Sequence, residues 1–155
     1  MLRQGLAALG PFAIVLLGLS SAVYQPLGPD VFVVAASPLG ISPALAALLA
    51  VFSTTVGSAG GYLVGRGALR SLLSPLLRRH QDAVARAADW LRRRGVWVAA
   101  VAGLTPIPLT QVAWAAGVVR MPLLRFLLGV LLGVSLRFGL EAAFSNVLAG
   151  WLHAL

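Results

Sequence analysis

The chain has 155 residues, of which 59% are hydrophobic and 10% are charged. Its mean hydropathy of +0.93 excludes an ordinary water-soluble domain, in which about 25% of residues are charged. We therefore predict an all-α integral membrane protein, a small bundle in which residues 1–155 form a single domain and each span takes ~20 apolar residues. The chain has no cysteine, which excludes disulfides, thiol nucleophiles and thiolate metal sites.

The positive charge is gathered in one stretch. The formal net charge is +8, and all 12 basic residues are arginine. Eight of these arginines lie in residues 66–94, together with Asp82 and Asp89. A basic stretch in an apolar chain is typical of a cytoplasmic loop beside anionic lipid headgroups, so we expect lipid rather than nucleic acid as its partner. The 2 histidines are too far apart in the sequence to indicate a metal site.

The first part of the chain is apolar but contains two different patterns. Residues 5–23 are long enough for a first span, with a cleaved signal peptide as the alternative because small residues end the run. Residues 24–43 are also apolar but are broken by prolines and glycines, including Pro26 and Pro29, so no continuous helix can cross there. We predict that residues 24–43 form a re-entrant hairpin packed against protein.

The central part combines a span with a surface segment. Residues 44–65 are predicted to be a second span, and their many small residues favour close helix packing. Residues 66–94 have apolar positions at helical spacing opposite the arginines. This pattern predicts an amphipathic helix on the cytoplasmic membrane surface.

The last part repeats the sequence of a broken segment and a span. Residues 95–120 are interrupted at Thr105, Pro106 and Pro108, which predicts a second re-entrant hairpin. Residues 122–155 are helical in pattern. They fit either one long tilted helix or a helix with a break near its middle.

The prolines indicate an internal repeat. Pro29 and Pro43 have the same spacing as Pro108 and Pro122, with an offset of 79 residues. Only one span, residues 44–65, separates the two predicted hairpins, so they must enter the membrane from opposite faces. An inverted-topology repeat of this kind is typical of secondary transporters, in which broken helices meet near the membrane midplane.

Charged residues in membrane segments are costly and mark candidate functional sites. Asp30 in the first hairpin is a candidate proton acceptor, with an ordinary surface turn as the alternative. Arg137 and Glu141 share a helix face. Arg137 could bind a phosphate or carboxylate group and Glu141 could pair with it in the empty state, with a purely structural ion pair as the alternative. Thr110 and Gln111 could add polar contacts.

Several short motifs resemble those of one membrane-protein family. These motifs are Pro29-Asp30, Gly61-Tyr62-Leu63-Val64-Gly65-Arg66, Thr105-Pro106-Ile107-Pro108, Ala115-Ala116-Gly117, Met121, Arg125-Phe126, Gly133 and Arg137-Phe138. They are similar to those of the DedA family, also called VTT or SNARE-associated proteins, and most similar to its short YqaA-type branch. The larger DedA type has arginines near the hairpin proline. Gly103, Leu109 and Thr110 stand there instead, so that type's arginine-dependent mechanism is not transferred.

The resemblance implies a protein with two re-entrant loops, related to lipid translocases and scramblases, including carriers of undecaprenyl phosphate. Proton coupling is suggested for some relatives. We predict a non-enzymatic transporter without cofactor in a prokaryotic inner membrane, translocating an anionic or phosphate-bearing lipid. The alternative is a structural or assembly protein that transports nothing. The sequence leaves open whether the chain forms a homo-oligomer.

Overall fold

The computed structural model describes residues 2–20, 29–105 and 108–154. It confirms the predicted all-α class, since these residues form helices joined by short turns and contain no strand. The elements in chain order are α1 (Leu2–Ser20), α2 (Asp30–Val34), α3 (Pro43–Val64), the π-helical turn η1 (Gly65–Leu69), α4 (Arg70–Leu72), α5 (Ser74–Arg79), α6 (Gln81–Leu104), α7 (Leu109–Val118) and α8 (Leu123–Ala154).

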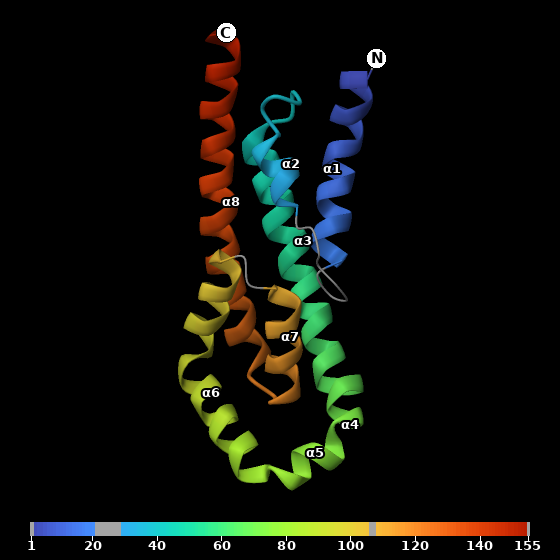
Figure 1. Cartoon of the computed structure of the whole chain (residues 1–155), viewed down its shortest axis with the longest axis vertical. Helices are drawn as coiled ribbons and strands as arrows, with labels where there is room; N and C mark the ends of the chain where they lie inside the picture. Colours follow the sequence, from blue (N-terminus) through green and yellow to red (C-terminus); the bar gives the residue numbers. More distant parts are fainter. Residues whose placement is uncertain (1, 21–28, 106–107, 155) are drawn as a thin grey trace.

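Two long helical runs extend in opposite directions through the molecule (Figure 1). The first consists of α3, η1 and α4, and the second is α8. Within the described residues, Pro43–Leu72 and Leu123–Leu148 are long and apolar enough to cross a membrane, with 30 and 26 residues. At 1.5 Å per residue, both exceed the ~30 Å of a hydrocarbon core.

The other helices form two pairs at opposite ends of the long runs. In Figure 1, α1 descends from the upper end to about mid-height and α2 points back up. At the lower end, α6 rises to mid-height and α7 returns downward, while α4 and α5 connect α3 to α6. Residues 21–28, between α1 and α2, lie outside the described residues.

Helix α1 lies largely within the predicted first span, residues 5–23, whose last three residues are outside the described part of the chain. Helix α1 ends at Ser20, packs along α3 and covers only the upper part of the length of α3 and α8 (Figure 1). Together with α2 it forms the upper of the two helix pairs. Hydropathy measures how apolar a segment is and does not give the depth at which a helix ends.

Two further boundaries differ from the sequence pattern. Helix α6 runs without a break from Gln81 to Leu104, so the end of the basic segment and the first arm of the second pair are one helix, while the earlier part of that segment forms η1, α4 and α5. Helix α8 is continuous from Leu123 to Ala154, which settles the alternatives for residues 122–155 in favour of one long helix. A single glycine such as Gly139 costs a helix only ~1 kcal/mol, and no proline interrupts α8.

The contacts between the two halves of the chain are reciprocal. Helix α2 of the first half packs on α8, and α7 of the second half packs on α3. Within the halves, α1 packs on α3 and α6 packs on α8. Both α2 and α7 begin after an N-cap proline, Pro29 and Pro108. These matches, together with the opposite directions in Figure 1, support the predicted inverted repeat.

Glycines allow the closest helix contacts. A Cβ atom on Gly117 of α7 would meet backbone atoms of Tyr62 and Arg66, and one on Gly65 would meet the backbone of Trp114. Gly129 and Gly133 of α8 likewise face backbone carbonyls of α6. Small residues spaced in this way let helices approach each other without a side chain between them. The glycines of the family-like motifs are thus packing positions.

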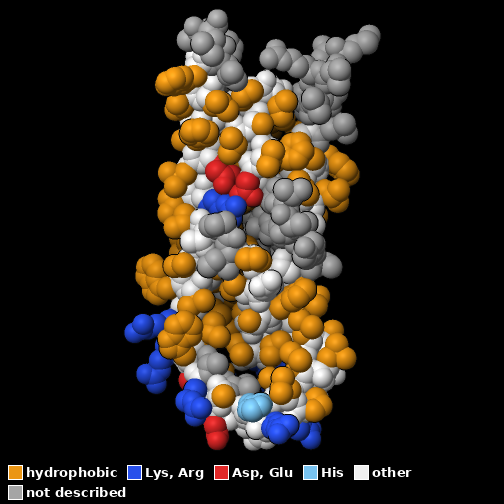
Figure 2. All heavy atoms as spheres, viewed as in Figure 1, with side chains coloured by type: hydrophobic (Ala, Val, Ile, Leu, Met, Phe, Trp, Pro, Cys, Tyr) orange, Lys and Arg blue, Asp and Glu red, His pale blue; other side chains and the backbone are white. Residues whose placement is uncertain are grey.

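The described outer surface is mostly apolar, and most of its arginines lie at one end. Large hydrophobic side chains are exposed along both long helices, among them Phe52 at 69% and Leu124 at 71%. Figure 2 shows hydrophobic side chains over most of the visible face, with the arginines gathered at the lower end. A surface of this kind fits a lipid environment, with the basic end at the headgroups.

Candidate functional site

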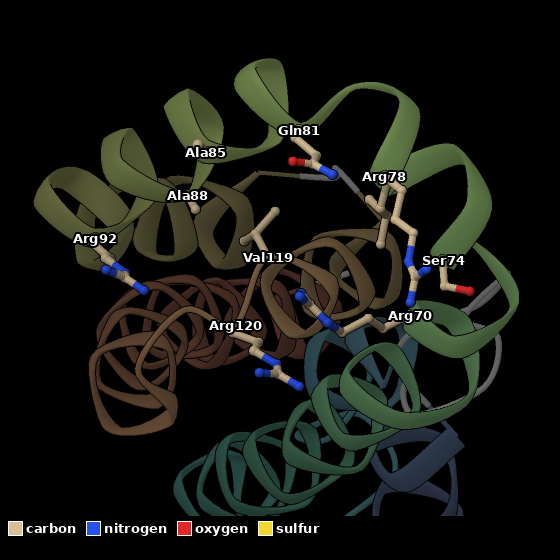
Figure 3. Close-up of a pocket in the computed structure, with 10 residues that line it drawn as sticks. Arg70, Ser74, Arg78, Gln81, Ala85, Ala88, Arg92, Val119 and Arg120 are labelled. Carbon is tan, nitrogen blue, oxygen red and sulfur yellow. The ribbon is translucent and has the colours of Figure 1, made fainter.

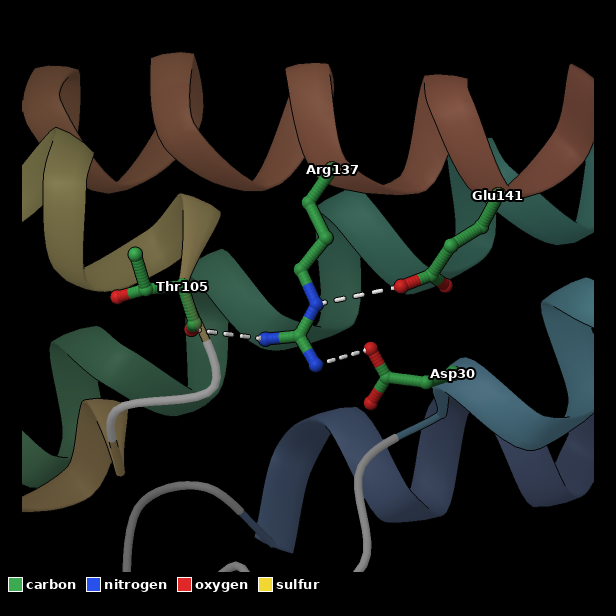
Figure 4. Close-up of polar contacts among 4 residues, drawn as sticks. All are labelled: Asp30, Thr105, Arg137 and Glu141. Carbon is green, nitrogen blue, oxygen red and sulfur yellow. Dashed lines mark hydrogen bonds and ion pairs between the residues drawn. The ribbon is translucent and has the colours of Figure 1, made fainter.

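Arg137 of α8 is the centre of a charged cluster at mid-height (Figure 4). One terminal nitrogen pairs with the Asp30 carboxylate. Its Nε lies 3.2 Å from Glu141 Oε1, and its other terminal nitrogen donates to the Thr105 carbonyl oxygen at 3.3 Å. One guanidinium therefore connects α8, the start of α2 and the end of α6.

The local structure explains why these groups meet. Asp30 is the first residue of α2 and follows Pro29, which is fully buried and fixes where the helix begins. Thr105 follows the last residue of α6, where a carbonyl has no partner within its helix and can accept a bond from elsewhere. Arg137 and Glu141 lie one turn apart on α8 and share a face.

A second contact holds α2 against α8 one turn beyond Glu141. The backbone N–H of Ser37 donates to Ser145 Oγ at 3.0 Å, and Ser145 is completely buried. This contact ties the turn after α2 to α8 without using a charge. The position of Asp30 beside Arg137 is therefore supported by a neutral hydrogen bond as well as by the ion pair.

The cluster is only partly enclosed. The side chains of Arg137, Asp30 and Glu141 are 27%, 24% and 19% exposed. Figure 2 shows acidic and basic side chains together on the lateral face of the molecule, surrounded by hydrophobic ones. With both carboxylates ionised the cluster has one negative charge in excess. Such an excess is costly at membrane depth.

The structure brings together Asp30, Arg137 and Glu141 of the predicted site residues. Thr110 is buried at the start of α7, whereas the Gln111 side chain is exposed. Pro108 is the exposed N-cap residue of α7. Two further candidates lie outside the described residues, namely Pro26 and Pro106.

Sequence reasoning named Thr105 as part of a hairpin motif and missed its role as a partner of Arg137. The contact uses a backbone carbonyl, which every residue has, so no side-chain pattern could reveal it. The available signal was the proline pattern after Thr105, which predicts the end of a helix and hence carbonyls without helical partners. Among the described residues, no group of three or more His, Cys, Asp or Glu side chains could hold a metal ion.

Comparisons with known proteins identify relatives without an assigned function. A family model described as the VTT domain matches residues 27–147. An uncharacterized protein of Methanocaldococcus jannaschii is 26% identical over 131 residues, which cover 84% of this chain and 81% of the relative. An uncharacterized protein of Haemophilus influenzae is 28% identical over 135 residues, covering 84% and 67%. No solved structure gives a significant match.

Proposed function

We propose, from the premise that this chain belongs to the VTT-domain (DedA) family of membrane proteins, that it translocates an anionic, phosphate-bearing lipid across the membrane. The observation that carries the proposal is Arg137, a cation at mid-height that contacts residues from both helix pairs. Both pairs then act as re-entrant hairpins whose inner ends meet at the headgroup site, with the basic end of the molecule in the cytoplasm.

The contacts of Arg137 are of the kind that a phosphate group can replace. A guanidinium presents five N–H donors and binds phosphate oxygens in pairs. In the structure these donors are directed at oxygen atoms of Asp30, Glu141 and Thr105. A headgroup phosphate would take over the bonds to the carboxylates, while the Thr105 carbonyl keeps the guanidinium oriented.

The two carboxylates link headgroup binding to proton uptake. An anionic headgroup is repelled by Asp30 and Glu141 as long as both are ionised. Protonation of both removes the repulsion and leaves Arg137 as a cation without a charged partner. Headgroup binding and proton uptake then favour each other, which couples lipid movement to the proton gradient.

The partial exposure of the cluster supports a lipid rather than a soluble anion as the substrate. The charged side chains are visible on a lateral face that is otherwise hydrophobic (Figure 2). A headgroup can reach such a site sideways while its acyl chains stay in the bilayer. Exposed hydrophobic residues on the neighbouring face of α8, such as Leu136 at 54% and Leu140 at 61%, offer a surface for those chains.

The test is a flux assay with the purified protein in liposomes. Fluorescent phosphatidylglycerol, phosphatidic acid and a phosphorylated isoprenoid are compared with phosphatidylcholine, and movement is read from the loss of chemically reducible label. The informative variant is Asp30→Asn with Arg137→Gln and Glu141→Gln, which neutralises all three groups at once. Changing Arg137 alone would leave both carboxylates without their partner and confound folding with function.

We expect the triple variant to fold but to lose anionic-lipid flux. Arg125→Gln, which removes an arginine of α8 that donates to the Arg92 carbonyl instead, is the matched control and should retain flux. Flux of the triple variant equal to wild type would refute the proposal and favour the structural role of the cluster. Absence of flux in the wild type for every lipid would do the same.

The proton step has its own test. Asp30→Asn keeps the size of the side chain but removes its titration, so lipid flux should no longer depend on a pH gradient. Circular dichroism and gel filtration check that the variant is folded. Flux that responds to pH as in the wild type would show that Asp30 only positions Arg137.

A further inference from the structure

A second polar site lies at the basic end of the molecule, remote from the mid-height cluster. A pocket of about 570 Å³ opens between the arch formed by α4, α5 and α6 and the turn that joins α7 to α8 (Figure 3). Its lining includes arginines from four different elements, namely Arg70 of α4, Arg78 of α5, Arg92 of α6 and Arg120 of the turn.

The pocket is positive without internal compensation. None of the residues that line it is acidic, and its other polar side chains are Ser74 and Gln81. In the described part of the chain the ion pairs are those of Arg137, so none of the pocket arginines is neutralised by a carboxylate. Figure 3 shows Arg70, Arg78 and Arg120 around the pocket, with the Arg70 side chain extending toward the turn that carries Arg120.

Contacts to backbone carbonyls hold the Arg70 side chain and the turn of α6 that carries Arg92. Arg70 donates one of its N–H groups to the Val118 carbonyl at the end of α7, and a guanidinium keeps further donors for a ligand. The Arg92 carbonyl accepts a bond from the Arg125 side chain at 2.8 Å, which holds this turn of α6 beside α8. The pocket is thus built from anchored segments, whereas a solvated charged face would need no such anchoring.

Arg120 carries a conformational cost that packing does not explain. Its φ of 57° makes it the one described non-glycine residue in the left-handed region. It ends α7 with two bonds, from Arg120 N–H to the Gly117 carbonyl at 3.0 Å and from Met121 N–H to the Ala116 carbonyl at 2.9 Å. Glycine is the favoured residue at this place in such a helix end.

The other half of the chain shows what the same turn looks like with the favoured residue. Gly40 N–H donates to the Ser37 carbonyl at 3.0 Å and Ile41 N–H to the Ala36 carbonyl at 2.9 Å, with Gly40 at φ 78°. The equivalent place in the second half holds an exposed arginine that lines a basic pocket. A strained residue retained at such a place indicates a role for its side chain.

We propose that this pocket binds a phosphate group, with Arg70, Arg78 and Arg120 as its main donors. Arginine suits this ligand because its planar fork matches two phosphate oxygens. The phosphate belongs either to a lipid headgroup at the membrane surface or to a small soluble phosphate. The site is independent of the cluster around Arg137, so it stands or falls separately from the proposed transport.

Binding is measured by calorimetry on the purified protein in a non-ionic detergent, with three probes. Dioctanoyl phosphatidic acid represents the lipid headgroup, glycerol 3-phosphate the soluble phosphate, and dioctanoyl phosphatidylcholine the headgroup without net charge. Tighter binding of phosphatidic acid than of glycerol 3-phosphate identifies a lipid site, and the reverse identifies a soluble ligand. Equal binding of the two phosphate probes identifies a site that reads the phosphate alone.

The variant that decides is Arg120→Gly. It relieves the left-handed strain, so the thermal midpoint should stay the same or rise, while the affinity for the phosphate probe should fall about tenfold or more through loss of a charge-assisted bond. Arg78→Gln should weaken binding similarly. Arg79→Gln, the neighbour outside the pocket lining, is the matched control for charge and should change affinity by less than about twofold.

Two results would overturn the proposal. One is a loss of affinity with Arg79→Gln as large as with Arg78→Gln, which would mean that net charge attracts the anion and the pocket does not. The other is that no phosphate probe binds the wild type more tightly than phosphatidylcholine does. Because Arg120→Gly is expected to leave the fold intact, unfolding cannot explain its loss of binding.

Discussion

The first half of the chain, α1 to α3, and the second half, α6 to α8, share one plan and differ in where they place polar groups. At the offset of 79 residues, Arg137 and Glu141 of α8 correspond to Ser58 and Tyr62 of α3. Ser58 donates to a carbonyl of its own helix at 2.7 Å, and Tyr62 donates to the Met121 carbonyl at 2.5 Å. At these positions the first half makes neutral hydrogen bonds, and the second half has charged side chains.

In the short helices α2 and α7 the charged residue belongs to the first half and the neutral one to the second half. Asp30, next to the N-cap proline of α2, corresponds to Leu109, next to the N-cap proline of α7. The acid of one half therefore meets the base of the other at a single place, and the repeat has one charged cluster instead of two. The predictions below test this comparison.

The largest effect is expected from labelling, because accessibility from one face of a membrane is all or none. Gly40 and Arg120 occupy equivalent turns, are both exposed and lie at opposite ends of the molecule. In this cysteine-free chain, a membrane-impermeant maleimide should label Gly40→Cys from outside and Arg120→Cys from inside. Arg79→Cys, also at the basic end, is the control and should label with Arg120→Cys. Labelling of both turns from one face would contradict the inverted repeat.

The second prediction compares the two hairpin interfaces. A Cβ on Gly117 would meet backbone atoms of Tyr62 and Arg66, so Gly117→Ala should lower the free energy of unfolding by ~3 kcal/mol through overpacking. Ser37 has the matching place in the turn of the first half, because its carbonyl accepts from Gly40 as the Gly117 carbonyl accepts from Arg120. Its backbone N–H bonds Ser145 Oγ. Ser37→Ala keeps that bond and should cost less than ~0.5 kcal/mol. Thermal unfolding in detergent measures both, and equal costs would contradict the packing role of Gly117.

The third prediction uses the two left-handed turns, which should respond with opposite signs. Gly40→Ala adds a Cβ that meets no atom within 4 Å, so its cost is conformational and should be ~1 kcal/mol. Arg120→Gly removes a strain of similar size and should stabilise the protein by up to ~1 kcal/mol. Unfolding midpoints of the two variants give the signs directly. Destabilisation by Arg120→Gly would mean that its side chain contributes more to the fold than its backbone costs.

Much of the frame follows from local sequence patterns. Prolines stop helices and clustered arginines mark a basic end, so the positions of the chain breaks and the presence of a basic end could be predicted. The members of the cluster could also be found, because Asp30, Arg137 and Glu141 are charged residues in apolar segments. Burial of charge is unfavourable enough that such residues are conspicuous without any structure.

Other features depend on three-dimensional contacts that leave no local pattern. The apolar run of α1 does not reveal the depth at which the helix ends. The Thr105 carbonyl and the Val118 carbonyl are backbone groups that any residue supplies. The basic pocket needs Arg70 and Arg120, which are distant in sequence and meet only because α7 folds back beside α3.

The smallest effect is expected at Tyr62, the neutral counterpart of Glu141. Its ring stacks on Phe126 with centroids 5.8 Å apart, and its hydroxyl donates to the Met121 carbonyl. Tyr62→Phe keeps the ring and removes one hydrogen bond, so unfolding in detergent should become easier by ~1 kcal/mol. Flux should stay at the wild-type level, because this bond only fixes the turn after α7.

Glu141→Gln is the matched change in the other half. It should alter the pH dependence of flux, since Glu141 is part of the charged cluster. A change of that pH dependence by Tyr62→Phe as large as the change by Glu141→Gln would mean that the neutral interface belongs to the transport site as well. The division between a neutral half and a charged half would then fail.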